Sequence, residues 1–119
     1  MADEGKRNLR ARTTAYALRI IRLYGTLPKT TEAQVIGRQL LRSGTSVGAH
    51  YREADRAKST ADFISKMEGA LQELDETEYW LELLCDSNSV PAKRLQPLLQ
   101  ETNEIISIFV TIVKRTKGH

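Results

Sequence analysis

Hydrophobic residues recur along the chain at alternating spacings of three and four residues, in four separate segments. In the third segment the repeat continues from Phe63 to Leu84, which is three heptads. A mean spacing near 3.5 residues is typical of helices that pack against one another at shallow angles. The pattern therefore predicts four helices and no strand, with the helices at about residues 8–25, 31–57, 60–86 and 92–115.

Residues typical of helix ends separate these segments. Pro28 follows the first segment. Thr31 with Gln34 has the spacing of a capping box, in which two side chains satisfy the free amides of a first turn. Ser59 with Asp62 is the acidic variant of the same pair. We therefore expect the second helix to begin at Thr31 and the third to begin just after Ser59.

The connections between the segments are short, so neighbouring helices should run antiparallel. Pro97 is awkward for the fourth helix, because proline lacks the amide that a helix interior needs. Either the helix begins at Pro97, or Pro97 lies in a first turn. The fold predicted for residues 1–119 is a single all-α domain, an up-down-up-down four-helix bundle.

A run of small residues, 43–49, lies in the second helical segment. Gly44 and Gly48 stand four residues apart in this run, and the hydrophobic repeat passes through it without a break. A phosphate-binding loop would need a preceding strand and a Lys-Ser or Lys-Thr pair after the second glycine, and both are missing. We expect Gly44 and Gly48 to let a neighbouring helix approach closely, or the helix to bend there.

The composition is that of a globular protein, with 40% hydrophobic and 28% charged residues. Cys85 is the only cysteine, so no internal disulfide forms and a reducing compartment is expected. The N-terminal residues contain no apolar signal segment. The most apolar run, 105–113, is much shorter than the roughly 20 residues that span a bilayer. We expect a cytoplasmic protein without membrane contact.

Charge is distributed unevenly among the predicted helices. Residues 60–86 contain eight acidic residues and one basic residue, whereas the other segments are basic. This contrast favours docking of the acidic helix against basic neighbours. Arginines form one stripe on the second helix and a shorter one on the first: Arg38, Arg42, Arg52 and Arg56, and Arg12, Arg19 and Arg22. Such stripes suit the phosphate backbone of RNA or DNA, and the alternative is a solvated face neutralised by nearby carboxylates.

Catalytic and metal sites have weak support in the sequence. His50 and Glu53 form a single His-x-x-Glu pair, whereas di-metal bundles need several such motifs in the opposite order. Helical-bundle ribonucleases have an arginine and a histidine separated by four to six residues, and Arg42 and His50 have seven residues between them. Cys85 lies beside the apolar repeat, where an inert side chain is expected. We expect no enzyme activity, no metal and no cofactor.

Two motifs resemble a known family: "RSGTSVGAHYREA" (42–54) and "DFISKMEGALQELDETEYWLELL" (62–84). They are similar to bacterial four-helix bundles encoded in intervening sequences of large-subunit ribosomal RNA genes, a family that includes accessory proteins of diversity-generating retroelements. The resemblance implies ring-shaped pentamers. It also implies, from the retroelement member, a basic surface that binds nucleic acid and a reverse transcriptase. His50 departs from the pattern, since the family usually has Asn there, and the resemblance implies no catalytic residues.

The apolar residues outnumber the positions of one bundle core. Residues 105–113 are apolar except for Ser107 and Thr111, and the third helix adds Tyr79, Trp80 and Leu83 outside its own repeat. A surplus of this kind marks an interface, and Tyr and Trp are favoured there. We predict a homo-oligomer with these three residues at or near the contact. Two functions stay open: nucleic-acid binding, possibly beside a partner protein, and a purely structural or adaptor role.

Overall fold

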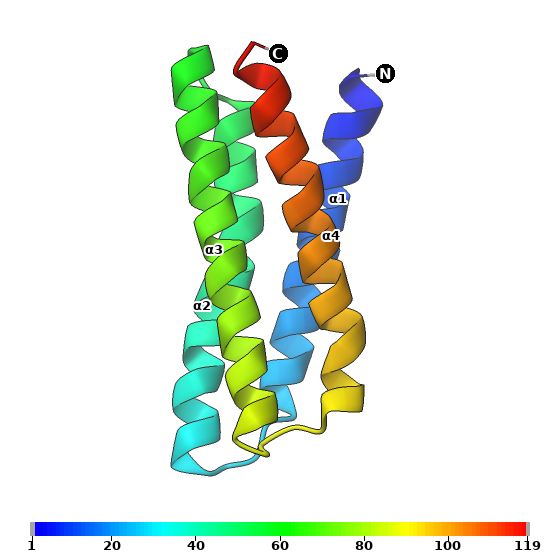
Figure 1. The fold of residues 1–119 in the computed structure, drawn as a ribbon, viewed down its shortest axis with the longest axis vertical. Helices are drawn as coiled ribbons and strands as arrows, with labels where there is room; N and C mark the ends of the chain where they lie inside the picture. Colours follow the sequence, from blue (N-terminus) through cyan, green and yellow to red (C-terminus); the bar gives the residue numbers. More distant parts are fainter. Residues whose placement is uncertain (1, 119) are drawn as a thin grey trace.

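The computed structural model describes residues 2–118, with side chains from Asn8 to Gly118. Its four α-helices are α1 (Ala2–Gly25), α2 (Thr31–Asp55), α3 (Thr60–Asp86) and α4 (Ala92–Thr116), and no strand occurs in this range. Consecutive helices run in opposite directions, so both chain ends lie at one end of the bundle (Figure 1). The bundle measures 46 × 22 × 21 Å. The prediction of four packed helices is confirmed.

α2 begins at Thr31 as predicted, but the predicted capping residue is wrong by one position. Thr30, not Thr31, is the N-cap, and its hydroxyl accepts a hydrogen bond from the amide of Ala33 at 3.3 Å. Gln34 does not complete a capping box, because its side-chain amide donates to the carbonyl of Pro28. The physical reason is that Thr30 has extended backbone angles, φ −68° and ψ 154°, which an N-cap requires.

The other helix ends differ in detail from the prediction. Ser59 caps α3 as expected, accepting from the amide of Asp62 at 3.0 Å. α2 ends at Asp55 rather than at residue 57, and α1 begins six residues earlier than expected. α4 begins at Ala92, so Pro97 lies in its second turn and neither predicted position for Pro97 is right. Pro97 is exposed, so water reaches the carbonyl that loses its partner.

The core forms along the inner faces of all four helices. Its largest fully buried side chains are Tyr16, Ile20, Leu40, Met67, Leu74, Leu81, Leu84, Leu95, Ile105 and Phe109. α2 and α3 pack together most extensively, whereas α1 and α4 make the loosest of the four helix pairings. α1 therefore lies diagonally across the bundle from α3 (Figure 1).

A polar layer crosses the middle of this core. Each helix contributes one fully buried member: Tyr16, Ser43, Thr77 and Thr102. The Tyr16 hydroxyl lies 2.6 Å from that of Thr102, and the Ser43 hydroxyl lies 2.8 Å from that of Thr77. Both threonine hydroxyls also donate to carbonyls of their own helices, so Tyr16 is the donor to Thr102. The Ser43 hydroxyl donates to Thr77 at 2.8 Å in preference to the carbonyl of Leu40, which lies 3.4 Å away. Burial raises the pKa of Tyr16, and the hydroxyls of Thr102 and Thr77 oppose that change.

Glycines bring α1 and α2 close together. A Cβ added at Gly44 would lie 2.8 Å from Cγ1 of Ile20, and one at Gly48 would lie 3.1 Å from Oγ1 of Thr13. Gly37, which the sequence analysis did not single out, is equally tight, with a Cβ 2.5 Å from Cδ1 of Leu27. The small run of α2 thus lies in a helix, against α1.

Candidate nucleic-acid interface

Three of the four arginines predicted as a stripe, two on α2 and one at its C-cap, face solvent without a described carboxylate partner. Arg38, Arg52 and Arg56 are exposed, and none of them makes an ion pair with a residue whose side chain is described. Arg52 donates to the hydroxyl of Thr14 on α1, at 3.2 Å, which directs its guanidinium toward the α1–α2 seam. These side chains remain available to an external anion.

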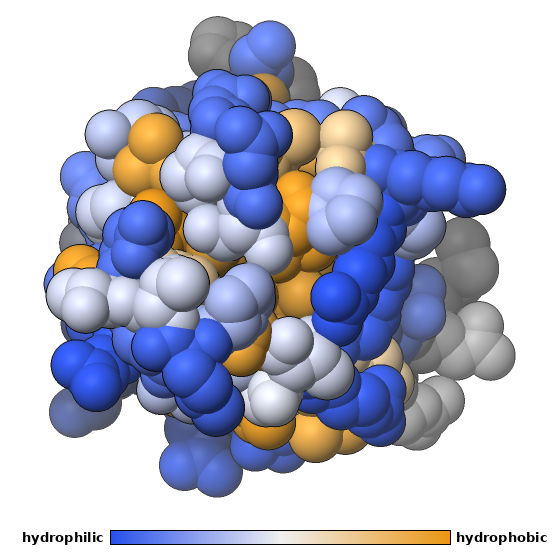
Figure 2. Space-filling model, turned by 90° about the horizontal axis from the view of Figure 1, so that it is seen from below, coloured by the Kyte–Doolittle hydropathy of each residue, from blue (hydrophilic) through white to orange (hydrophobic). Residues whose placement is uncertain are grey.

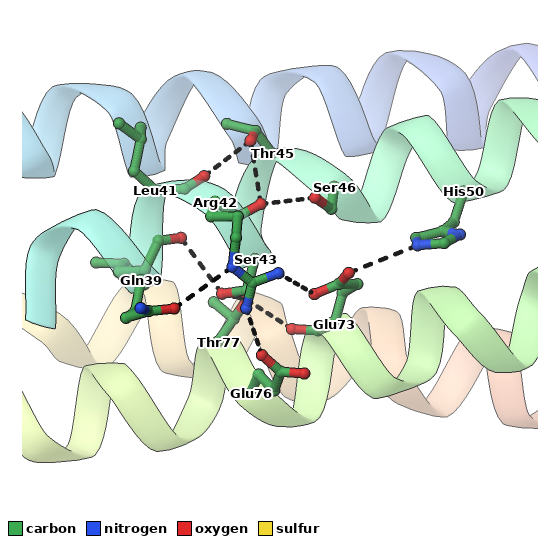
Figure 3. A network of polar contacts seen from close by, with 11 residues as sticks. Gln39, Leu41, Arg42, Ser43, Thr45, Ser46, His50, Glu73, Glu76 and Thr77 are labelled. Atoms are coloured by element: carbon green, nitrogen blue, oxygen red, sulfur yellow. Dashed lines mark hydrogen bonds and ion pairs between the residues drawn. The ribbon is translucent and has the colours of Figure 1, made fainter.

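Arg42 is placed differently from the rest of its stripe. Its guanidinium lies between two carboxylates of α3, 2.6 Å from Glu76 and 3.4 Å from Glu73 (Figure 3). The hydrogen bond with Glu76 is the largest of the contributions that raise the pKa of Arg42. Arg42 therefore serves the α2–α3 contact.

Arg12 is likewise engaged inside the bundle. Its guanidinium donates to both carboxylate oxygens of Glu101 and to Glu104, each at 2.8 Å, and so joins α1 to α4. The hydrogen bond from Arg12 holds the pKa of Glu101 below its usual range, although burial opposes the shift. Arg42 thus makes a docking contact with the acidic helix α3 of the kind that the charge distribution favoured, whereas Arg12 pairs with α4.

Arg10 of α1 joins the arginines of α2, and the sequence analysis missed it. Arg10, Arg52 and Arg56 line a hollow of about 270 Å³, and Glu53 is the one acidic side chain among the described residues that line it. The helix pairing brings them together, and sequence spacing alone does not show this. We call Arg10, Arg38, Arg52 and Arg56 the basic face.

A second group of arginines lies at the opposite end of α1. Arg19 and Arg22 of α1 and Arg94 of α4 line a cleft of about 290 Å³ that contains no acidic side chain. We call this the three-arginine cleft. The predicted α1 stripe is therefore divided: Arg12 pairs with α4, whereas Arg19 and Arg22 face the cleft.

His50 lies between two carboxylates. Its Nε2 is 3.5 Å from Glu73 (Figure 3), and its Nδ1 is 3.4 Å from Glu53. A Cβ added at Gly69 would lie 3.1 Å from the ring. Since both ring nitrogens face carboxylates of the same molecule, neither is directed at an external substrate. Within the described residues, no cluster of three or more His, Cys, Asp or Glu side chains is arranged to hold a metal ion.

Large hydrophobic side chains are exposed on three helices, with Val35 of α2 53% exposed. On α3, Tyr79 is 53% exposed, its ring is tilted against that of Trp80 at 5.0 Å between centroids, and Leu83 is half-buried. On α1, Leu18 and Ile21 are 44% and 46% exposed, and the sequence analysis did not identify them. Hydrophobic residues are also visible among hydrophilic ones on the surface at the end of the bundle that carries the α1–α2 and α3–α4 connections (Figure 2).

The helices and charged surfaces define a four-helix bundle with a basic outer face. Among the described residues, none of the helices has both the length and the apolar character of a membrane span. The model of the 23S rRNA-intervening sequence protein family matches residues 7–111. The chain therefore belongs to the family of 23S rRNA-intervening sequence proteins, as its motifs suggested.

A solved structure agrees with this assignment. It is a crystal structure of a protein with unknown function from the S23 ribosomal protein family of Bacteroides thetaiotaomicron, and it is 38% identical to this chain. The two superpose with a TM-score of 0.85, over 92% of this chain and 97% of that one. Comparison with curated proteins finds no match.

Proposed function

We propose that this protein is a non-enzymatic homo-oligomer that binds the phosphate backbone of nucleic acid through its basic face. The observation that carries the proposal is the set of guanidinium groups on α1 and α2 that the described carboxylates leave unpaired. Arginines in this arrangement suit an electrostatic contact that is independent of base sequence. The name of the family refers to 23S rRNA, so RNA is the first probe.

Charge reversal on the basic face tests the proposal. Arg38 and Arg56 are exposed, so Arg38→Glu with Arg56→Glu should leave the fold intact. Arg42 is a poor choice, because its loss would disturb the contact with α3. With two phosphate contacts removed, the slope of log affinity against log salt should flatten by roughly 1.5, equally for all RNA and DNA sequences.

Lys29→Glu with Lys114→Glu is the matched control, since it makes the same change in net charge at exposed positions away from this face. The control should bind within about twofold of the parent at each salt concentration. If both double variants lost the same affinity, the effect would come from net charge and not from the basic face. An intact oligomer that binds neither RNA nor DNA would favour the structural or adaptor role, with a protein as the partner.

The oligomer in this proposal is a closed ring. Cyclic rings need two different surfaces on each subunit, one for each neighbour. Two sets of apolar residues lie on helices at opposite corners of the bundle, the exposed Leu18 and Ile21 on α1 and the exposed Tyr79 beside the half-buried Trp80 on α3. Val35 of α2 is exposed outside both sets. Contact between the α3 residues of one copy and the α1 residues of the next would cover both. The family resemblance is the reason to expect five subunits.

A further inference from the structure

The three-arginine cleft differs from the basic face in its lining. Arg19, Arg22 and Arg94 converge on one concavity without a described carboxylate, whereas the hollow of the basic face includes Glu53, and Arg38 extends that face along α2. The rest of the cleft wall is apolar apart from Thr26. A line of cations suits a chain of phosphodiesters, each with one negative charge. Converging cations suit one compact group that carries more charge.

Arg94 is oriented toward this concavity by a hydrogen bond. The hydroxyl of Thr26 donates to the carbonyl of Leu23 at 2.9 Å, so its oxygen is left to accept from Nη2 of Arg94. This contact ties the start of α4 to the end of α1. The guanidinium retains further donors for a ligand.

The described carboxylates do not neutralise the cleft. Glu101 is the acidic group that interacts with Arg19, but both of its oxygens accept hydrogen bonds from Arg12. The first turn of α4 contains no acidic residue and has basic Lys93 and Arg94 instead. Cations at a helix N-terminus are unfavourable, so a bound anion would offset a repulsion that the described part of the chain leaves in place.

We propose that the three-arginine cleft binds a terminal phosphate monoester of a nucleic-acid strand, an inference that rests on the proposed function. A monoester carries between one and a half and two negative charges near pH 7 and has three terminal oxygens. An internal phosphodiester carries only one negative charge and has fewer free oxygens. The cleft would thus hold the end of a strand, while the basic face holds its length.

The test uses one short RNA sequence in three forms, with a 5′-phosphate, with a 3′-phosphate and with hydroxyls at both ends. Charge-assisted hydrogen bonds of this kind correspond to about tenfold in affinity. The parent protein should therefore bind one of the phosphorylated forms about tenfold more tightly than the hydroxyl form. Comparison of the 5′ and 3′ forms identifies the end that is held.

Arg94→Gln should abolish this preference and leave affinity for the hydroxyl form within about twofold. Lys93→Gln is the matched control, because it removes one charge from the adjacent residue, which does not line the cleft, and it should keep the preference. Equal binding of all three RNA forms by the parent overturns the inference, as does an identical loss in the two variants. Binding of the phosphorylated form alone would support the cleft and contradict the basic face.

Discussion

Gly44 lies so close to Ile20 that an added methyl group has no room. The Cβ would lie 2.8 and 2.9 Å from two carbons of a fully buried side chain. Gly44→Ala should therefore lower the free energy of unfolding by about 1–3 kcal/mol through overpacking, despite the better helix propensity of alanine. Urea denaturation measures the change.

Alanine substitutions at Gly48 and Gly25 are comparisons in which the added Cβ has more space than at Gly44. At Gly48 the nearest atom would be the Thr13 hydroxyl at 3.1 Å, so Gly48→Ala should change stability by less than about 1 kcal/mol, because propensity offsets the contact. At Gly25 nothing lies within 4 Å, and alanine should be tolerated. A Gly44→Ala protein as stable as the Gly25→Ala protein would show that the approach of α1 is not tight.

The ion pair between Arg12 and Glu101 should make stability depend on pH. Since folding lowers the pKa of Glu101, its contribution is complete above the ordinary glutamate pKa of about 4.3. It is lost as the pH falls through the lower pKa of the folded state. Glu101→Gln should cost about 1 kcal/mol at pH 7, and this cost should decrease as the pH is lowered to 3.

Glu104→Gln is the comparison for this pair, because the Glu104 side chain is 51% exposed against 18% for Glu101. The more exposed carboxylate should give the smaller change, as expected for a solvent-screened pair. Urea denaturation at both pH values decides the matter. A cost for Glu101→Gln that grows as the pH falls would contradict a pKa of Glu101 lowered by Arg12.

At the scale of the helices, the repeat of apolar residues was sufficient to locate all four. This follows because one face of every helix is buried along most of its length, as in α3, where Met67, Leu74 and Leu81 are fully buried. The ends were less predictable. Thr30 and Thr31 are both threonines, and only the backbone angles at Thr30 identify it as the cap. The predicted position of Pro97 was also wrong, because an exposed helix face tolerates the missing amide of a proline beyond the first turn.

The N-cap of α2 can be tested by comparing the stability of alanine variants at Thr30 and Thr31. Thr30→Ala should cost about 1 kcal/mol, because its hydroxyl accepts from the amide of Ala33. Thr31→Ala should be close to neutral, because Thr31 is an exposed residue of the first turn. Thermal unfolding of the two single variants measures the difference. A larger loss of stability for Thr31→Ala than for Thr30→Ala would support the capping box that the sequence suggested.

At the scale of the whole molecule, the candidate site was only partly predictable from the sequence. Periodicity placed the arginines of α2 on one face, and three of the four do face outward. It could not show that Arg42 reaches Glu76 or that Arg12 reaches Glu101, because those contacts depend on how the helices pair. For the same reason Arg10 and Arg94 were missed: each joins arginines from another helix.

A head-to-tail ring predicts that two defective surfaces can complement each other. The parent should form particles of about 67 kDa, five chains of 13.4 kDa, by light scattering at micromolar concentration. Tyr79→Glu disrupts the α3 surface, and Ile21→Glu disrupts the α1 surface. Ile21 is chosen rather than Leu18 because Leu18 lines a surface hollow together with Arg10 and Arg52 of the basic face. Each variant alone should be a monomer, because the one surface that stays intact finds no partner.

A mixture of the two variants should give a heterodimer of about 27 kDa, since each protein retains the surface that the other has lost. Gln72→Glu is the control, because it adds the same charge at another exposed position of α3 and should leave the particle unchanged. A parent particle of 13.4 kDa would refute the oligomer, and a dimer or tetramer would refute the count of five. Failure of the mixture to dimerise would refute the pairing of α3 with α1, because two intact complementary surfaces would then be present and unbound.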